Sequence, residues 1–113
     1  MVTIYKIFRS VENDDFVRRG ETEGSPVDIA DGFIHFSTVE QVAETAAKHF
    51  SGETDLKLLA LDADLLGDDL RWEPSRGGQL FPHLYRRLRI DDILWTRDLP
   101  LGAKGHEFGD QLS

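Results

Sequence analysis

Cysteine is absent from this chain of 113 residues, and methionine occurs once. Without cysteine the chain can form no disulfide, thiol nucleophile or cysteine-ligated metal site, and we expect a cytoplasmic protein. Long hydrophobic runs are absent too: no stretch approaches the roughly 20 apolar residues of a membrane-spanning helix, and no charged-then-apolar leader opens the chain. We therefore expect neither a membrane span nor a signal peptide.

Positive charge is also scarce. The 13 Lys and Arg residues are outnumbered by 21 Asp and Glu residues, and the formal net charge of −8 argues against broad electrostatic binding to nucleic acid. The basic residues are nevertheless concentrated in one short span, which contains Arg71, Arg76, Arg86, Arg87 and Arg89. This distribution predicts a locally positive patch on an acidic protein.

The stretch DGFIHFSTVEQVAETAAKHF, residues 31–50, changes from strand to helix periodicity. Its first part alternates like a strand and puts His35 and Ser37 on one face. From Val39 onward the apolar residues follow a helical stripe. Ser37 and Thr38 both have the spacing of a capping box. Because backbone donors at a helix N-terminus favour anionic groups, this junction predicts a site.

The remaining pattern predicts an α+β fold. Apolar or alternating runs indicate further strands at 3–9, 56–63, 70–75, 80–85 and 93–98, a thin apolar stripe indicates a helix over 11–19, and glycine and proline indicate a loop over 21–31. One or two helices would pack against a sheet of about six strands. We expect a single domain over 1–100 and a loosely ordered C-terminal tail over 101–113, where the pattern ends.

The candidates for chemistry are isolated polar residues, because the chain has no glycine-rich phosphate loop and no serine-hydrolase elbow. His35 and His83 have apolar neighbours, so each is either a buried histidine with a structural hydrogen bond or a contact for a ribose or phosphate. Arg71, Glu73 and Ser75 project together from one strand. They form either a simple ion pair or a carboxylate that points into a cleft and polarises a sugar hydroxyl.

Metal binding is not expected. The four histidines and many acids could supply ligands, but no pair has helical or hairpin ligand spacing.

Three blocks occur in order between Ile4 and Trp95: DGFIHFSTVEQ, then KHFSGETDLKLLALDADLLGDDLRWEPSRGG, then LFPHLY. They resemble a small bacterial family of domains of unknown function, number 952. That family is similar in fold to the ADP-ribosyltransferases and, more distantly, the RNA 2′-phosphotransferases, whose sheet halves clasp NAD. The resemblance implies a single ADP-ribosyltransferase-like domain with a split β-sheet. On the first strand, Tyr5-Lys6 stands where those enzymes have a Tyr-His or Arg-His pair.

The resemblance also implies NAD or another small-molecule nucleotide as the ligand, and roles for particular residues. Glu73 is the nearest counterpart of the catalytic glutamate, and His35 would hold the ribose beside the reaction. The expected cofactor-binding residues are His35, Ser37, Thr38, Arg71, Ser75, Arg76 and His83, with the arginines on the phosphates.

Two alternatives remain open. The first is a non-catalytic module of the same fold that binds a nucleotide or phosphate. The second is a phosphoesterase with two histidines, because His35-Phe36-Ser37 and His83-Leu84-Tyr85 echo paired His-x-Ser/Thr strands. That reading requires the two imidazoles to lie within roughly 10 Å of each other, so that one phosphate reaches both.

Overall fold

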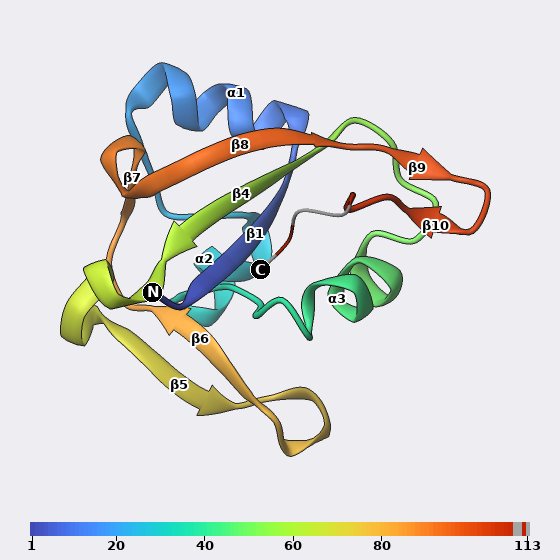
Figure 1. Ribbon diagram of the computed structural model, residues 1–113. Helices are drawn as coiled ribbons and strands as arrows, with labels where there is room; N and C mark the ends of the chain where they lie inside the picture. Colours follow the sequence, from blue (N-terminus) through green and yellow to red (C-terminus); the bar gives the residue numbers. More distant parts are fainter. Residues whose placement is uncertain (110–111, 113) are drawn as a thin grey trace.

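The structure is a computed structural model that describes residues 1–109 and 112, with the backbone but not the side chain of Arg76. Figure 1 shows the arrangement of its elements. In chain order they are β1 (Thr3–Arg9), α1 (Ser10–Arg19), β2 (Glu21–Thr22), α2 (Pro26–Asp31), β3 (Ile34–His35), α3 (Val42–His49), β4 (Leu56–Asp62), η1 (Ala63–Asp69), β5 (Leu70–Pro74), η2 (Arg76–Gly78), β6 (Leu80–Leu84), β7 (Leu88–Arg89), η3 (Ile90–Asp92), β8 (Ile93–Leu99), β9 (Leu101–Gly102) and β10 (Gly105–His106).

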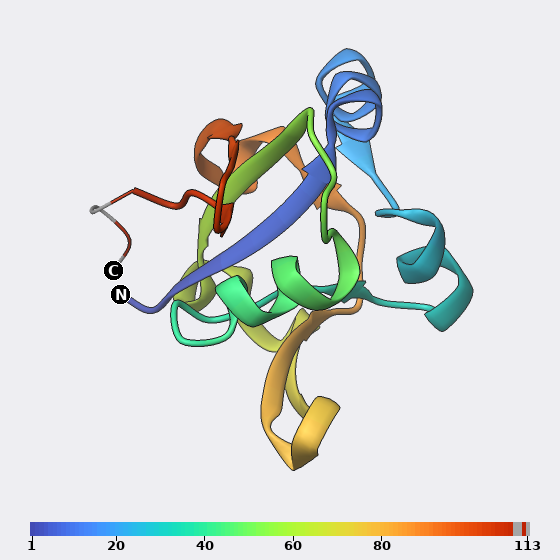
Figure 2. The same ribbon diagram turned by 90° about the vertical axis from the view of Figure 1, so that its right-hand side faces the viewer.

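Two three-stranded antiparallel sheets carry the fold, in the orders β1-β4-β8 and β3-β6-β5. An isolated bridge joins them, in which Tyr5 N donates to Ser37 O (2.8 Å) and Ser37 N donates to Tyr5 O (2.9 Å). The chain after β3 therefore leaves one sheet and touches the edge of the other. Beyond this bridge the sheets diverge, and the β5–β6 hairpin projects away from β1 and β4 (Figure 2).

Strand β4 is the centre of its sheet because it is apolar on both faces. Leu58, Leu59, Ala60 and Leu61 are fully buried between β1 and β8. The two faces belong to two separate cores, the first closed by α1 and the second by α3. The first includes Ile4, Phe8, Phe16, Leu59 and Leu61, and the second Tyr5, Ile7, Val42, Ala46, Leu58 and Ala60.

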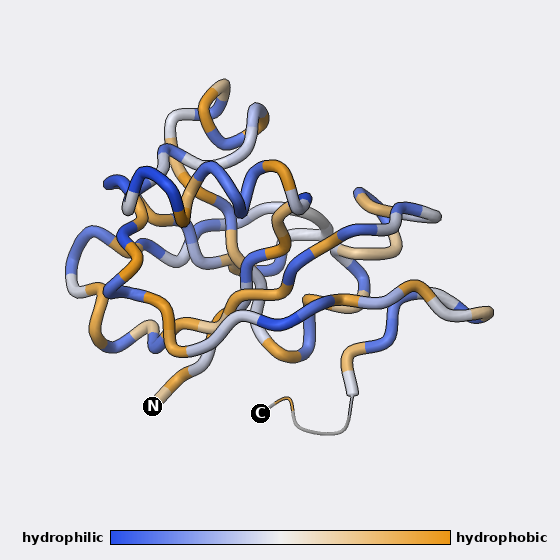
Figure 3. Tube along the Cα trace, turned by 90° about the horizontal axis from the view of Figure 1, so that it is seen from above, coloured by the Kyte–Doolittle hydropathy of each residue, from blue (hydrophilic) through white to orange (hydrophobic). Residues whose placement is uncertain are grey.

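The observed architecture confirms the α+β prediction: the sheets are antiparallel and a few helices cover them. Hydrophobic and hydrophilic residues follow one another within each helix and strand and do not gather in long blocks of one kind, as Figure 3 shows along the trace. This alternation is what a small domain with two thin cores requires. Within the described residues, no helix is long and apolar enough to cross a membrane.

The structure differs from the sequence-based prediction at α2, which lies inside the loop expected over 21–31. Ser25 is its N-cap, Pro26 its first residue, and Asp28 accepts a hydrogen bond from Ser25 N at 2.9 Å. Gly32 ends the helix with φ 84°. These are ordinary start and stop signals, but they enclose only one and a half turns, too few for an apolar period to develop.

Helix α3 begins three residues later than its apolar stripe suggests. The residues before it form a turn in which Gln41 Oε1 accepts from Thr38 N at 3.0 Å. Gln41 is buried here and its amide also donates to Leu80 O at 2.8 Å. The turn thus ties the start of α3 to the β5–β6 hairpin.

A short hairpin of β9 and β10 lies within the segment 101–113 that we expected to be loosely ordered. His106 Nε2 lies 2.9 Å from Glu53 O, which links the hairpin to the loop after α3. Phe108 and Leu112 pack against the α3 core. Residues 110, 111 and 113 of this segment lie outside the described part of the chain.

Candidate active site

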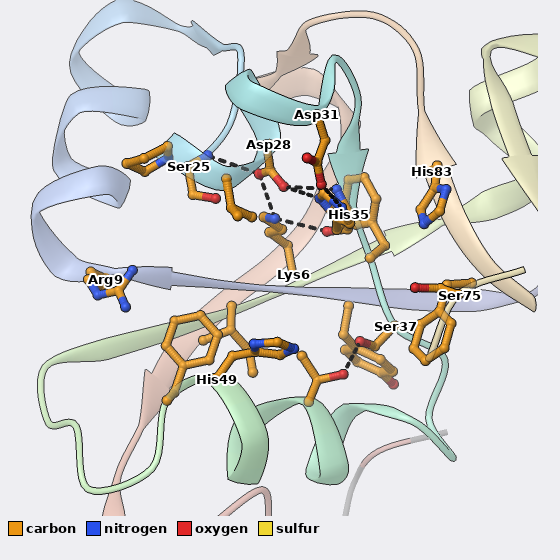
Figure 4. Close-up of a pocket in the computed structure, with 18 residues that line it drawn as sticks. Lys6, Arg9, Ser25, Asp28, Asp31, His35, Ser37, His49, Ser75 and His83 are labelled. Carbon is orange, nitrogen blue, oxygen red and sulfur yellow. Dashed lines mark hydrogen bonds and ion pairs between the residues drawn. The ribbon is translucent and has the colours of Figure 1, made fainter. Parts of the chain in front are cut away.

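A cleft of about 550 Å³ opens where the two sheets part. Its walls come from β1, the start of α2, the strand from His35 to Ser37, the second half of α3, and β6 (Figure 4). Four residues singled out from the sequence line it: His35, Ser37, Ser75 and His83. The cleft also contains charged residues that the sequence had not drawn attention to, notably Lys6 and Asp28.

Asp28 is the hub of the polar network in this cleft. Its side chain is 0% exposed and accepts from Lys6 Nζ at 2.7 Å, Ser25 N at 2.9 Å and His35 N at 3.1 Å. The His35 ring adds a contact of 2.6 Å from Nδ1. Burial by itself would raise the pKa of Asp28, but the hydrogen bond from His35 and the charge of Lys6 outweigh it and hold the pKa below its ordinary value.

Lys6 is a buried cation on β1, next to the bridge between the sheets. Its ammonium donates to Asp28 and also to His35 O at 2.9 Å. Burial lowers the pKa of Lys6, and the carboxylate of Asp28 opposes that shift. The pair therefore fixes α2 and β3 against β1.

His35 lies between two carboxylates of α2. Nδ1 contacts Asp28 Oδ1 at 2.6 Å, and Nε2 contacts Asp31 Oδ2 at 3.0 Å. The Nδ1 contact is a hydrogen bond, and the carboxylate of Asp28 accepts it, so Nδ1 carries a proton. Its side chain is 31% exposed and reaches the cleft.

His83 lies beside His35 because β3 and β6 pair in that register. The two ring centroids are 5.3 Å apart at an interplanar angle of 69°. His83 Nδ1 contacts Glu73 Oε1 at 2.8 Å, whereas Nε2 is buried and has no hydrogen-bond partner in the described part of the chain. Phe33 stacks on the His83 ring at 4.2 Å.

Glu73 does not line the cleft but lies directly behind His83. Its carboxylate accepts from the Tyr85 hydroxyl at 2.7 Å as well as from His83, and these hydrogen bonds lower the pKa of Glu73. The same contact raises the pKa of Tyr85. Glu73 is thus placed to orient the imidazole of His83.

The other expected residues are more dispersed. Ser37 is buried, and its hydroxyl lies 2.8 Å from Thr45 Oγ1 at the side of α3. Thr38 belongs to the turn before α3 and does not line the cleft. Arg71 stacks over the ring of Tyr85 at 4.7 Å, outside the cleft. The side chain of Arg76 lies outside the described part of the structure.

Two arginines of the expected positive patch are paired with acids, Arg86 with a nearby one and Arg87 with two from a distant segment. Arg86 binds Asp92 with two hydrogen bonds of 2.9 and 3.0 Å, and Arg87 contacts Glu21 and Glu23. Clustering in the sequence therefore does not produce a free cationic surface at these two positions.

Sequence reasoning missed Asp28 and Asp31 because they fell in an expected loop. The sequence did contain a signal: Ser25-Pro26 is a typical helix start, and the two acids that follow are three positions apart, which puts both carboxylates on one side of a helix. Among the described residues, no group of three or more His, Cys, Asp or Glu side chains is arranged to hold a metal ion.

Residues 7–96 match the sequence model of a family described as "Protein of unknown function (DUF952)". The chain belongs to this family. The predicted membership is thereby confirmed for most of the domain. No curated protein matches the chain.

Solved structures of a bacterial relative have the same fold. The X-ray structure of protein CC0527 from Caulobacter crescentus is 53% identical, with a TM-score of 0.88, and the match covers 92% of this chain and 91% of that one. The solution NMR structure of CC0527 is 53% identical, with a TM-score of 0.84 and coverage of 94% and 91%. The β-sheet framework is therefore shared with this relative.

Proposed function

We propose that the cleft binds a nucleotide of the NAD class and that the protein is an ADP-ribosyltransferase-like enzyme. The observation that carries this proposal is the division of the sheet at the bridge between Tyr5 and Ser37, which opens the cleft between two sheet halves. The ADP-ribosyltransferases, to which the resemblance in the sequence links this family by fold, clasp NAD between such halves. A volume of about 550 Å³ is in the usual range for small-molecule sites.

In this proposal, the cleft residues supply the hydrogen bonds to the ligand. The ring of His35 donates to a ribose oxygen, and the side chains of Ser37 and Ser75 line the same cavity. Arg71 does not line the cleft, so in this proposal the phosphates lie against Arg9, which lines the cleft with its side chain 43% exposed. Glu73 contributes by holding His83.

Isothermal titration with NAD tests the binding step. We expect wild-type protein to bind NAD, and His35→Asn to bind it more weakly because the ring that donates to the ribose is lost. His106→Asn is the matched control, since His106 lies in the β9–β10 hairpin outside the cleft. Absence of binding at millimolar NAD would refute the proposal.

NAD consumption tests turnover. We expect Glu73→Gln to lower the rate while leaving NAD binding in place, because Glu73 acts through His83. Glu40→Gln, an exposed acid on the turn before α3, is the control. Binding without consumption would identify the protein as a non-catalytic nucleotide-binding module.

A further inference from the structure

Strand β1 has a free edge that faces the cleft. It is the outer strand in the order β1-β4-β8, and on the edge away from β4 both the N–H and the C=O of Tyr5 bond to Ser37, at 2.8 and 2.9 Å. The backbone groups of successive residues in a strand alternate between its two edges. Ile7 therefore directs its N–H and C=O to the same edge as Tyr5.

The segment that pairs with Tyr5 does not continue opposite Ile7. In an antiparallel ladder the residue opposite Ile7 would be His35, because it lies two positions before Ser37. His35 instead pairs with His83 in the other sheet. The ladder thus splits after one pair of residues, and no strand of the described residues lies opposite Ile7 on this edge.

An unpaired strand edge inside a cleft is suited to a ligand that supplies backbone hydrogen bonds. Ile7 lines the cleft and is 5% exposed, so water has little access to it. In the described part of the chain, no hydrogen bond is made to its backbone on this edge. Buried backbone groups without partners carry a free-energy cost, which a donor and an acceptor from a ligand relieve. An extended peptide brings both at the spacing of a strand.

The groove along this edge has two walls. Figure 4 shows β1 crossing between α2, marked by Asp28, and α3, marked by His49. The α3 side includes Phe50, and the α2 side includes Pro26 and Val27, of which Val27 is 60% exposed. Successive side chains of a strand point to opposite faces, so a strand docked on β1 would contact both walls in turn.

The charges of the groove favour a basic peptide. Two cations of the lining are already paired, Lys6 with Asp28 and Arg9 with Glu53. Asp31 lines the cleft with its side chain 48% exposed, and among the described residues no lysine or arginine pairs with it. The net charge of −8 adds a long-range attraction for a basic partner.

We propose that the cleft binds an extended basic peptide, which adds a strand to the free edge of β1. One peptide residue lies opposite Ile7 and exchanges two backbone hydrogen bonds with it, as Ser37 does with Tyr5. This residue is apolar and points toward α3, because the side chain of Ile7 belongs to the core that α3 closes. Its two neighbours are basic and point toward α2, which carries Asp31.

The available edge is long enough for a short strand. From Tyr5 to Arg9 it spans about 13 Å, which matches about four residues of extended chain. At its far end Arg9 N donates to Glu12 Oε1 at 2.8 Å, so the Arg9 amide is not open to a peptide. The interaction needs no nucleotide and therefore goes beyond the proposed function.

Isothermal titration of the full chain with the peptide acetyl-Thr-Lys-Val-Lys-Thr-amide tests the binding. We expect saturable binding, and binding at least about tenfold weaker when the valine carries an N-methyl group, which removes the donor to Ile7 O. The same peptide with glutamate in place of both lysines should bind more weakly, and Asp31→Asn should narrow that difference. No binding at millimolar peptide, or equal binding of the N-methylated peptide, would overturn the proposal.

Two exposed valines provide matched variants. Val27 lines the cleft and is 60% exposed, whereas Val17 lies on α1 away from the cleft and is 62% exposed. In Val27→Lys the new ammonium lies four residues before Asp31 on α2, where it repels the lysines of the peptide and pairs with the carboxylate. We expect it to weaken binding at least about fivefold, and Val17→Lys to leave binding unchanged. Equal effects of the two variants would overturn the proposal.

Amide hydrogen exchange of the wild type separates strand addition from capture of side chains alone. The N–H of Ile7 should exchange more slowly when the peptide is bound, while that of Lys6, which points to β4, should change little. Unchanged exchange at Ile7 in the complex would overturn the proposal. All these measurements are made without NAD, so their failure leaves the proposed function standing, and a failure to bind NAD leaves the peptide site standing.

Discussion

The buried ion pair between Lys6 and Asp28 makes a strong prediction about stability. In Asp28→Asn the side chain keeps its size but loses its charge. The amide NH2 group of the asparagine also cannot accept the hydrogen bonds that the carboxylate accepts from its neighbours. The ammonium of Lys6, 7% exposed, then stays buried without a counter-charge. Removing one partner of a buried pair costs about 3–5 kcal/mol, a large share of the 5–15 kcal/mol that holds a typical domain together.

Urea unfolding followed by circular dichroism measures this loss. With a slope of about 1–3 kcal/mol/M for a small domain, the midpoint should fall by at least about 1 M. Asp31→Asn is the matched control, because the Asp31 side chain is 48% exposed and its contact should be worth less than about 1 kcal/mol. If both variants lose equally little, the network around Asp28 does not hold the fold together.

A double-mutant cycle isolates the pair itself. Lys6→Met leaves the carboxylate without its cation, and combining it with Asp28→Asn removes both charges. We expect the double variant to be more stable than the sum of the two single losses predicts, because no unpaired charge remains buried. Strict additivity would contradict the coupling.

The same carboxylate sets a pH dependence. Its folded-state pKa lies below the unfolded-state value of about 3.9, so its stabilisation is complete above that value and is lost as the pH falls through the folded-state pKa. The urea midpoint of the wild type should therefore drop as the pH is lowered from about 5 to 2. The drop should be smaller in Asp28→Asn, which has no carboxylate to protonate at this position.

Two further perturbations test the surroundings of the cleft. Gly24→Ala should destabilise the protein more than Gly20→Ala in urea unfolding. Both glycines have positive φ, but an added Cβ at Gly24 would lie 2.4 Å from Asp28 Oδ2, whereas one at Gly20 meets nothing within 4 Å. Equal losses would show that α2 moves freely. Tyr85→Phe removes the main hydrogen bond that lowers the pKa of Glu73, so carbon-13 NMR should show that pKa rising toward its ordinary value, and an unchanged pKa would mean that the Tyr85 contact is not made in solution.

The elements of the first sheet could be predicted because their signals are local. The continuous apolar run of β4 predicts a strand buried on both faces, and Leu58 to Leu61 are fully buried. The capping chemistry of Ser25 and Pro26 was equally local, yet α2 is too short to have a period of its own. That single omission concealed Asp28, and with it the centre of the cleft.

The site itself depends on pairings that a linear pattern does not specify. His35 meets His83 only through the β3–β6 register, although the two residues are 48 positions apart in the sequence. Alternation along β5 correctly groups Arg71 with Glu73 on one face, but it does not say which of them contacts the cleft. In the structure Arg71 stacks on Tyr85. Glu73 does not line the cleft itself but contacts the ring of His83, which does.

The charges of the cleft also indicate what kind of ligand it selects. Lys6 is matched by Asp28, and Arg9 by Glu53 at 2.8 Å, so these cations are largely neutralised before a ligand arrives. Among the buried side-chain atoms of the described residues that line the cleft, His83 Nε2 is left without a hydrogen-bond partner. A multiply charged phosphate would gain little from cations that are already paired, whereas a neutral ribose hydroxyl does not depend on them. Under the proposed function, the cleft should therefore recognise the sugar edge of a nucleotide more strongly than its phosphates, and an adenosine probe should compete with the full nucleotide for binding.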